Sequence, residues 1–150
     1  MKYIKLRPDV KDLKQKHNTD VGYDLYWYPP ENKYNLDKTK KEWYLLSSKK
    51  KHKFETGISL SLPKTVMGLI LDKSGIALKH GLHVLGGVID PGYIGEINII
   101  LYNTGKNLII KKGSPLAQLV FIPVMTPKMR QSKVFKNTKR GESGFNSKIK

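Results

Sequence analysis

Short runs of β-branched and aromatic residues, ended by glycine, proline or polar turns, recur along most of this chain and constrain its fold most strongly. No segment shows a sustained helical period, and Ser74–His80 is the one stretch predicted as a short helix. This pattern is typical of an antiparallel sandwich or barrel, including jelly-roll forms. The sequence therefore predicts an all-β fold. The predicted strands are Lys2–Leu6, Val21–Trp27, Phe54–Leu62, Val66–Leu71, Leu82–Ile89, Glu96–Tyr102, Leu108–Lys111 and Leu116–Val124.

Two polar segments depart from this pattern. Pro29–Lys53 is rich in lysine and is predicted to form a long loop or a loosely paired excursion, at about residues 31–53. From Thr126 onward the apolar pattern ends, which is typical of a flexible tail. The length of 150 residues suits a single core. We expect one β-barrel domain over residues 1–125, followed by a C-terminal arm over residues 126–150.

The formal net charge of +16 favours an anionic partner, either nucleic acid or a polyanionic small molecule such as a nucleoside triphosphate. The lysines concentrate in Lys33–Lys53 and from Lys128 onward, in polar segments that flank the apolar centre, so a solvated surface is the favoured explanation for them. The absence of cysteine excludes disulfides, thiolate metal sites and a cysteine nucleophile. No apolar run suits a bilayer span or a signal peptide. We expect a soluble intracellular protein, cytoplasmic or, in a eukaryotic or viral setting, nuclear.

The segment Gly87–Glu96 carries the clearest chemical signal. It places Asp90 and Tyr93 on a glycine-punctuated turn between two apolar runs. A carboxylate held on such a turn can act as a general base, and a tyrosine nearby offers a flat apolar face to a sugar or base. Taken alone, the segment is equally consistent with a purely structural hairpin turn.

Five segments, taken together and in order, resemble the motifs of the trimeric dUTPases (dUTP pyrophosphatases). They are Asp20–Leu25, Asp72–Ala77, Gly87–Glu96, Gly113–Leu119 and Arg140–Ser147. The resemblance implies a jelly-roll-like β-barrel that works as a homotrimer with shared active sites. It also implies Mg²⁺-dependent hydrolysis of dUTP to dUMP and pyrophosphate, which limits uracil in DNA and supplies dUMP for dTMP synthesis. Neither a nucleic acid nor a membrane is required as a partner.

The resemblance assigns the nucleoside side of the site. Asp90 matches the general base that activates water for attack on the α-phosphate, and Tyr93 matches the residue that packs on deoxyribose and excludes a 2′-hydroxyl. Phe145 matches the aromatic residue that stacks on uracil. The backbone of the expected Leu82–Val88 hairpin would read the base. The positions expected to contact the base are Val84, Gly87, Val88 and Ile89.

The resemblance also assigns the phosphate side. A hydroxyl and exposed backbone N–H groups on the second motif can bind anionic oxygens, and an arginine suits a bidentate grip on a phosphate. Asp24 matches an aspartate expected to reach Mg²⁺ through water, because Mg²⁺ keeps several waters when phosphates supply its other ligands. The residues expected to bind phosphate are Lys73, Ser74, Gly75, Gln118, Arg140 and Ser147.

The chain departs from the family pattern at several positions. Asp72-Lys73-Ser74 replaces the usual Pro-Arg-Ser, and lysine lacks the planar fork of arginine. Asp72 is compatible with a neighbouring phosphate site if its carboxylate points away. The other departures are Gly92, Ile94, Ser114, Pro115, Ser143, Asn146 and Lys148.

Three alternatives remain open on sequence alone. A dCTP deaminase-like enzyme would share the barrel, but the Arg140–Phe145 arm argues against it. A catalytically weak nucleotide-binding or regulatory homologue is compatible with the departures in the motifs. A basic nucleic-acid-binding β-protein would need aromatic residues among its basic patches, and few are present.

Overall fold

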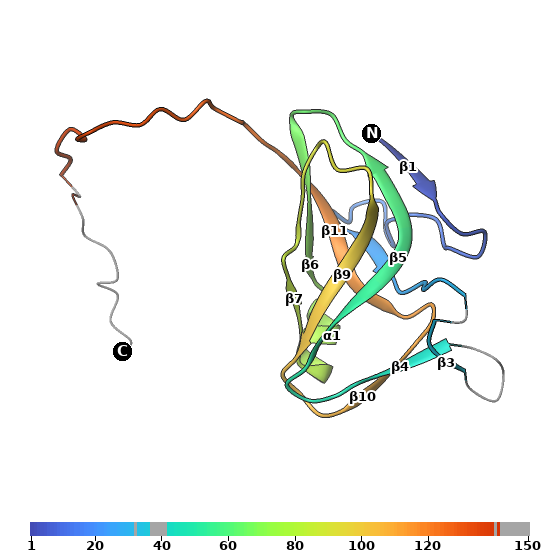
Figure 1. Cartoon of the computed structure of the whole chain (residues 1–150). Coiled ribbons are helices and arrows are strands. Elements are labelled where there is room, and N and C mark those ends of the chain that lie inside the picture. Colours follow the sequence, from blue (N-terminus) through green and yellow to red (C-terminus); the bar gives the residue numbers. More distant parts are fainter. Residues whose placement is uncertain (32, 37–41, 140, 142–150) are drawn as a thin grey trace.

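The computed structural model describes residues 1–31, 33–36, 42–139 and 141 (Figure 1). Its described part is built from strands and one short helix, which confirms the predicted all-β, jelly-roll-like class. The first sheet has the order β1-β5-β9-β7, the second β2-β11-β6-β8 and the third β10-β4-β3. The bounds are β1 Lys2–Lys5, β2 Tyr23–Tyr26, β3 Asn35–Leu36, β4 Glu42–Leu46, β5 Lys51–Ser61, β6 Val66–Asp72, α1 Ser74–His80, β7 Leu82–Leu85, β8 Val88–Ile89, β9 Glu96–Asn103, β10 Leu108–Lys111 and β11 Pro115–Pro123.

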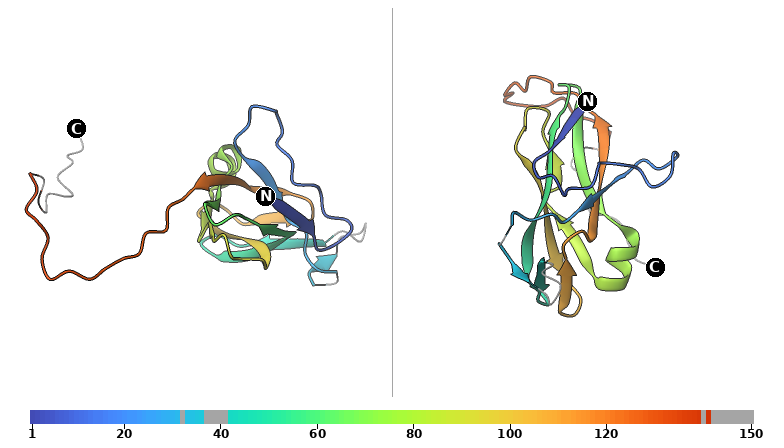
Figure 2. Two further views of the ribbon diagram at one scale, coloured as in Figure 1. Left: turned by 90° about the horizontal axis from the view of Figure 1, so that it is seen from above. Right: turned by 90° about the vertical axis from the view of Figure 1, so that its right-hand side faces the viewer.

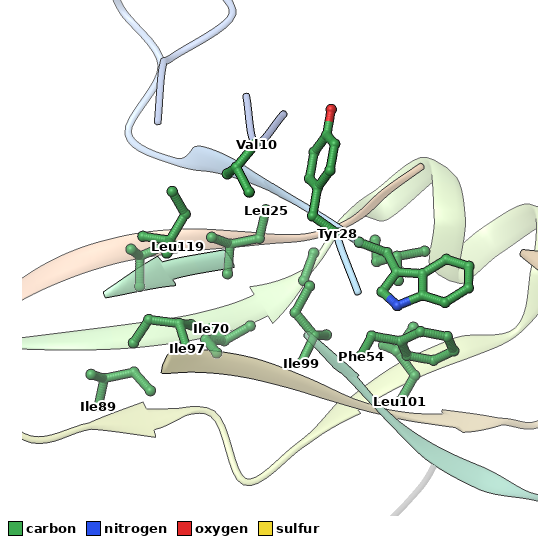
Figure 3. Packing of buried hydrophobic residues seen from close by; sticks show 14 of the residues in the cluster. Val10, Leu25, Tyr28, Phe54, Ile70, Ile89, Ile97, Ile99, Leu101 and Leu119 are labelled. Atoms are coloured by element: carbon green, nitrogen blue, oxygen red, sulfur yellow. The ribbon is translucent and has the colours of Figure 1, made fainter. Parts of the chain in front are cut away.

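The core lies between the first two sheets. Strand β9 alternates strictly between buried and partly exposed residues, as expected for a strand with one face on the core. Figure 3 shows Ile97 and Ile99 of β9 meeting Leu25 of β2 and Leu119 of β11, and all four side chains are almost completely buried. Apolar residues from sequence-distant strands thus form one continuous core, which fixes both sheets relative to each other.

The lysine-rich excursion contributes more structure than the sequence predicts. Strand β4 lies within it and pairs with β10, while Lys51–Lys53 forms the start of β5 rather than a loop. Leu46 of β4 is fully buried in the core. The sequence did not predict β4, because the residues around it are polar and only a few of its own side chains face the core.

The predicted strand Leu82–Ile89 is divided in two. Strand β7 pairs with β9 in the first sheet, whereas β8 pairs with β6 in the second, and the break falls at Gly86 and Gly87. The described strands include no β7–β8 ladder, so the expected Leu82–Val88 hairpin is instead a segment that crosses between sheets. The turn after β8 then leads back into the first sheet, where β9 pairs with β5 and β7.

The helix matches the sequence-based expectation, and the described part of the tail lies outside the sheets. Helix α1 spans Ser74–His80, as predicted, and lies on the surface with none of its residues buried. After β11 the chain leaves the sheets as an extended segment that reaches well away from the core (Figures 1 and 2). In the described residues 126–139 every side chain is exposed and no helix or strand forms. The division into a domain over residues 1–125 and an arm over 126–150 stays a proposal.

Candidate active site

Asp24, Lys73 and Gln118 come together at one end of the second sheet. Asp24 lies opposite Gln118 in the β2–β11 ladder, and the Lys73 ammonium contacts the Asp24 carboxylate directly. The Gln118 amide donates to the backbone oxygen of Asp72 at 2.9 Å. A Cβ on Gly22 would lie 2.5 Å from Gln118 Oε1, so glycine at this position leaves room for the amide.

The start of α1 continues this group. Ser74 and Gly75 are exposed, and Lys73 precedes the helix without a side-chain capping bond. Lys73, Ser74 and Gly75 line a cavity of about 380 Å³ together with Gln118. No carboxylate of the described residues takes part in its lining. Sequence reasoning missed two further residues of this lining, the cationic Lys79 and the neighbouring His80. Their spacing of about one helical turn from Gly75 and Ile76 was the signal that could have revealed them. The cavity is therefore suited to an anionic ligand.

Asp72 points away from this cavity. Its carboxylate accepts a hydrogen bond from the Val84 backbone N–H at 2.6 Å and lies 2.8 Å from His83 Nδ1. The negative charge of Asp72 is thus directed toward β7 and away from the cavity at the start of α1. A consequence is that the Val84 N–H already has a partner in this structure.

Asp90 and Tyr93 share a second cavity. It has a volume of about 170 Å³ and lies between β8 and β9, with Val88 and Ile89 on one side. Asp90 and Tyr93 are joined by a backbone hydrogen bond, from Tyr93 N–H to Asp90 O, at 3.0 Å. The turn therefore presents a carboxylate and an aromatic ring to the same space.

The tyrosine ring is positioned by contacts on both sides. Its hydroxyl donates to the backbone oxygen of Glu96 at 2.9 Å. A Cβ on Gly95 would lie 2.5 Å from that hydroxyl oxygen and 2.7 Å from Cζ, so only a glycine leaves the ring where it lies. Glycine 95 was visible in the sequence as part of the motif, but its contact with the ring was not.

Glu96 is itself anchored. Its carboxylate pairs with the Arg7 guanidinium and accepts the Gly57 backbone N–H at 2.7 Å. The same guanidinium donates to the backbone oxygen of Tyr28. These partly buried contacts connect the N-terminal segment to the start of β9 and so fix the position of the cavity wall.

Glu96 and Asn98 complete the lining of the Asp90 cavity. Neither was among the residues predicted from the sequence. The alternation of β9 was the available signal, because it places residues 96 and 98 on the side opposite the core.

The two cavities are separate in a single copy of the chain, and they share no lining residue. Along β6, Ile89 lies opposite Gly68 and Gln118 lies opposite Leu71, on the two sides of that strand. Standard strand geometry puts the Ile89 and Gln118 α-carbons about 14 Å apart. Asp90 follows Ile89 in the direction away from Leu71, so the separation from Gln118 is larger still.

The other residues expected in the site have different positions. Val88 and Ile89 line the Asp90 cavity, whereas Val84 and Gly87 do not, and the Gly87 carbonyl accepts the Ile70 N–H at 2.8 Å. Arg140, Phe145 and Ser147 lie outside the described residues.

The described residues contain no group of three or more His, Cys, Asp or Glu side chains suited to a metal ion. Asp24 is nevertheless a partly buried carboxylate in contact with Lys73, which lines the cavity at the start of α1, and a carboxylate in this position fits an ion otherwise held by phosphates and water. Burial and the negative charge of Asp24 raise the pKa of the neighbouring Tyr26. Within the described part of the chain, no helix has the length and apolar character needed to cross a membrane.

Comparisons with known proteins agree on one family. A family model described as dUTPase matches residues 9–148. A deoxyuridine 5′-triphosphate nucleotidohydrolase of Clostridium tetani is 37% identical over 145 residues, covering 95% of this chain and 91% of the relative. The corresponding protein of camelpox virus is 30% identical over 148 residues, covering 98% and 91%. A dUTPase variant of Staphylococcus bacteriophage 80alpha, solved with dUpNHpp, superimposes with a TM-score of 0.78 at 26% identity, covering 96% of this chain and 95% of the other.

Proposed function

Because the chain belongs to the dUTPase family, we propose that it hydrolyses dUTP to dUMP and pyrophosphate. The observation that carries this proposal is the cavity shared by Asp90 and Tyr93, which offers a base and a flat ring to one nucleotide. The separate cationic cavity at the start of α1 supplies the complementary phosphate-binding surface. A dCTP deaminase-like activity has no comparable support in the described residues.

Asp90 acts as the general base. It accepts a proton from a water molecule whose oxygen attacks the α-phosphorus. The new P–O bond forms as the bond to the oxygen bridging the α- and β-phosphorus atoms breaks, and pyrophosphate leaves with that bridging oxygen. A turn carboxylate beside a rigid ring suits this role because the water must be held in line with the leaving group.

Tyr93 selects the sugar. A ring packed on C2′ leaves no room for a 2′-hydroxyl, so UTP meets a clash and an unpaired polar group. The bond from the Tyr93 hydroxyl to the Glu96 carbonyl and the close approach of Gly95 support this role, because they hold the ring in one orientation.

The phosphates bind at the cavity beside α1. The Ser74 hydroxyl, the Gly75 backbone and the Gln118 amide are donors there, and Lys73 contributes charge. From the arm, Arg140 and Ser147 complete the phosphate contacts, and Phe145 stacks over uracil. The arm over residues 126–150 thereby closes the site built by the domain over residues 1–125.

Mg²⁺ is the cofactor of this proposal. Its position would be set mainly by the three phosphates, with Asp24 holding one of its water ligands. Bound there, the ion would neutralise charge on the phosphate oxygens.

The working form is a homotrimer with shared active sites. Asp90 and Gln118 lie too far apart in one copy to hold the same phosphate closely, which supports a site completed by a second copy.

Pyrophosphate release from dUTP, dCTP, dTTP and UTP, with Mg²⁺ and with EDTA, tests the function. We expect Mg²⁺-dependent release confined to dUTP. Release from none of the four, with dUTP still bound, would instead indicate a regulatory nucleotide-binding protein.

A further inference from the structure

Glu96 lies at a point where the ladder between β5 and β9 is irregular. The register shifts between Glu55 and Ser59, and Gly57 within this interval has a φ of 71°. Regular backbone pairing is interrupted here, as it is at a β-bulge. The Gly57 N–H instead donates to the Glu96 carboxylate, at 2.7 Å from Oε1. Contacts of the Glu96 side chain thus take the place of ladder bonds where β9 begins.

The Arg7 guanidinium makes the second contact of this carboxylate. Its Nη2 group donates to the same oxygen, Glu96 Oε1, at 2.5 Å, although the two residues are 89 positions apart in the sequence. The Arg7 and Glu96 side chains are 17% and 22% exposed, so water screens their attraction only in part. A Cβ on Gly57 would lie 2.2 Å from Val10 Cγ2 and 3.0 Å from Arg7 Nη2. Glycine at position 57 therefore leaves the space that the guanidinium needs.

The backbone carbonyl of Glu96 connects this anchoring to the Asp90 cavity. The carbonyl oxygen accepts the Tyr93 hydroxyl at 2.9 Å and the Asn98 side-chain amide at 2.8 Å. The orientation of the Tyr93 ring therefore depends on the position of this oxygen. Because the carboxylate and the carbonyl belong to one residue, and the ladder beside it is interrupted, loss of the carboxylate contacts would let the carbonyl move.

We propose that Arg7 is a specificity-determining positioning residue for the sugar. By holding Glu96, it sets the orientation of the Tyr93 ring, the sugar gate of the site, and so the preference for deoxyribose over ribose. This inference rests on the proposed hydrolysis of dUTP. Arg7 lines neither the Asp90 cavity nor the cavity at the start of α1, so its effect reaches the substrate through Glu96. A ring displaced by about 1 Å opens part of the space for a 2′-hydroxyl, and UTP then gains relative to dUTP.

The test measures the ratio of kcat/KM for dUTP to that for UTP in Arg7→Met, which removes the guanidinium and keeps a long side chain. The control is Lys5→Met, because Lys5 also makes an ion pair, with Asp12 at 3.3 Å, and does not line the Asp90 cavity. We expect Arg7→Met to lower the ratio about tenfold and Lys5→Met to leave it unchanged. Arg7→Lys keeps the charge and should retain more of the preference than Arg7→Met. Equal losses on both substrates in folded Arg7→Met, at an unchanged ratio, would make Arg7 purely structural and overturn the proposal.

A double-mutant cycle tests whether Arg7 acts through Glu96. Glu96→Met removes the shared acceptor and keeps the backbone carbonyl, so Arg7→Met/Glu96→Met should lower the ratio no further than the single substitutions do. Effects that multiply in the double variant would show independent actions and contradict positioning through Glu96. If Arg7→Met does not fold, the ratio is measured in Arg7→Lys and in the double variant, where no charge is left without its partner.

Binding measurements separate this inference from the proposed hydrolysis. Calorimetry with dUpNHpp and its ribonucleotide counterpart UpNHpp measures the same preference without turnover. If the wild-type protein releases no pyrophosphate from dUTP but binds dUpNHpp more tightly than UpNHpp, the proposed function fails on its own. Loss of that difference in Arg7→Met then supports the role of Arg7, and its persistence overturns it. Equal binding of both analogues by the wild-type protein would refute sugar selection by Tyr93 and this inference with it.

Discussion

The roles of single residues in this site depend on how rigidly each one is held. Asp90 lies on a turn closed by the Tyr93 N–H, and Tyr93 is fixed by Glu96 and Gly95. Because each side chain has its own contacts, a substitution can alter the general base, Asp90, or the sugar-selecting residue, Tyr93, without altering the other. The two following predictions use this property.

Replacing Asp90 with Asn should abolish the base and leave the shape of the cavity unchanged. We expect turnover to fall by a factor on the order of 10² to 10⁴, because an amide cannot take the proton from water. Binding of dUpNHpp should change little. Steady-state kinetics and calorimetry measure the two effects, with Glu31→Gln as an exposed control. Near-normal turnover in Asp90→Asn would show that another group is the base.

Replacing Gly95 with Ala should displace the Tyr93 ring, because the new Cβ would lie 2.5 Å from the hydroxyl oxygen. We expect relative use of UTP to rise several-fold as the sugar gate loosens. Gly92→Ala is the matched control on the same turn, since a Cβ there meets nothing within 4 Å. The ratio of kcat/KM for dUTP and UTP is the readout. A ratio equal in all three proteins would contradict the positioning of Tyr93 by Gly95.

At the scale of elements, sequence patterns predicted strands well where apolar alternation is strong. Strand β10 has the predicted bounds, and β9 extends the predicted run by a single residue. The patterns failed for β4, whose neighbours are mainly lysine, and at the break between β7 and β8, where pairing partners change without a change in composition.

The candidate site likewise contains residues that the sequence predicted and contacts that it did not. The Asp90 turn could be found from the sequence because Asp90 and Tyr93 stand on a glycine-punctuated turn between two apolar runs, in order with the other motifs. The anchoring of Glu96 by Arg7 and by the Gly57 N–H could not be found, because it joins residues that lie far apart in the sequence. Hydrogen-bond satisfaction is a property of the folded arrangement and leaves no mark on composition.

Strand β4 offers a direct test of the excursion's part in the core. Leu46→Ala should lower the free energy of unfolding by about 2–5 kcal/mol, because the side chain is fully buried. The neighbouring Leu45→Ala is the control, since Leu45 is 43% exposed and should cost much less. Chemical denaturation measures both values. Equal, small effects would mean that the excursion is not packed as the structure has it.

A second element-level test uses the cluster around His52 on β5. The ring stacks on Tyr44 at 3.8 Å between centroids, and its Nε2 lies 3.1 Å from the Tyr34 hydroxyl. Burial lowers the pKa of His52, opposed by the charge of Glu55 and assisted by that of Lys33. In the unfolded chain the same imidazole binds a proton more readily, so protonation favours unfolding.

His52 makes the stability of the folded protein depend on pH. Stability from His52 is fully present above its unfolded pKa of about 6.5 and decreases as the pH falls toward the lower folded value. Urea denaturation at pH 7.5, 6.5 and 5.5 should show this loss, and His52→Gln should reduce it. His17→Gln, at an exposed position, should retain the wild-type profile. A His52→Gln profile identical to wild type would assign the loss to other groups.

At the scale of the whole molecule, the distance between the two cavities is the main constraint. In one copy, Asp90 follows β8, which pairs with β6 at Gly68, whereas the phosphate donor Gln118 lies opposite Leu71, near the other end of β6. A trimer with shared sites resolves this separation, because each site can take Asp90 from one copy and Gln118 from the next. This arrangement predicts that two inactive variants restore each other's activity.

Asp90→Asn lacks the base but keeps the phosphate donors, while Ser74→Ala/Gln118→Ala keeps the base and lacks the donors. Every mixed trimer contains one junction at which an intact base meets intact donors. Random assembly of equal amounts, by co-refolding, should therefore give about one quarter of the wild-type rate, although each variant alone is nearly inactive. Distinguishable tags on the two variants establish that mixed trimers have formed. If mixed trimers form and the rate stays at the level of the single variants, each site lies within one copy, and the separation along β6 must be closed by movement within the chain. Recovery near one quarter requires that neighbouring copies share each site.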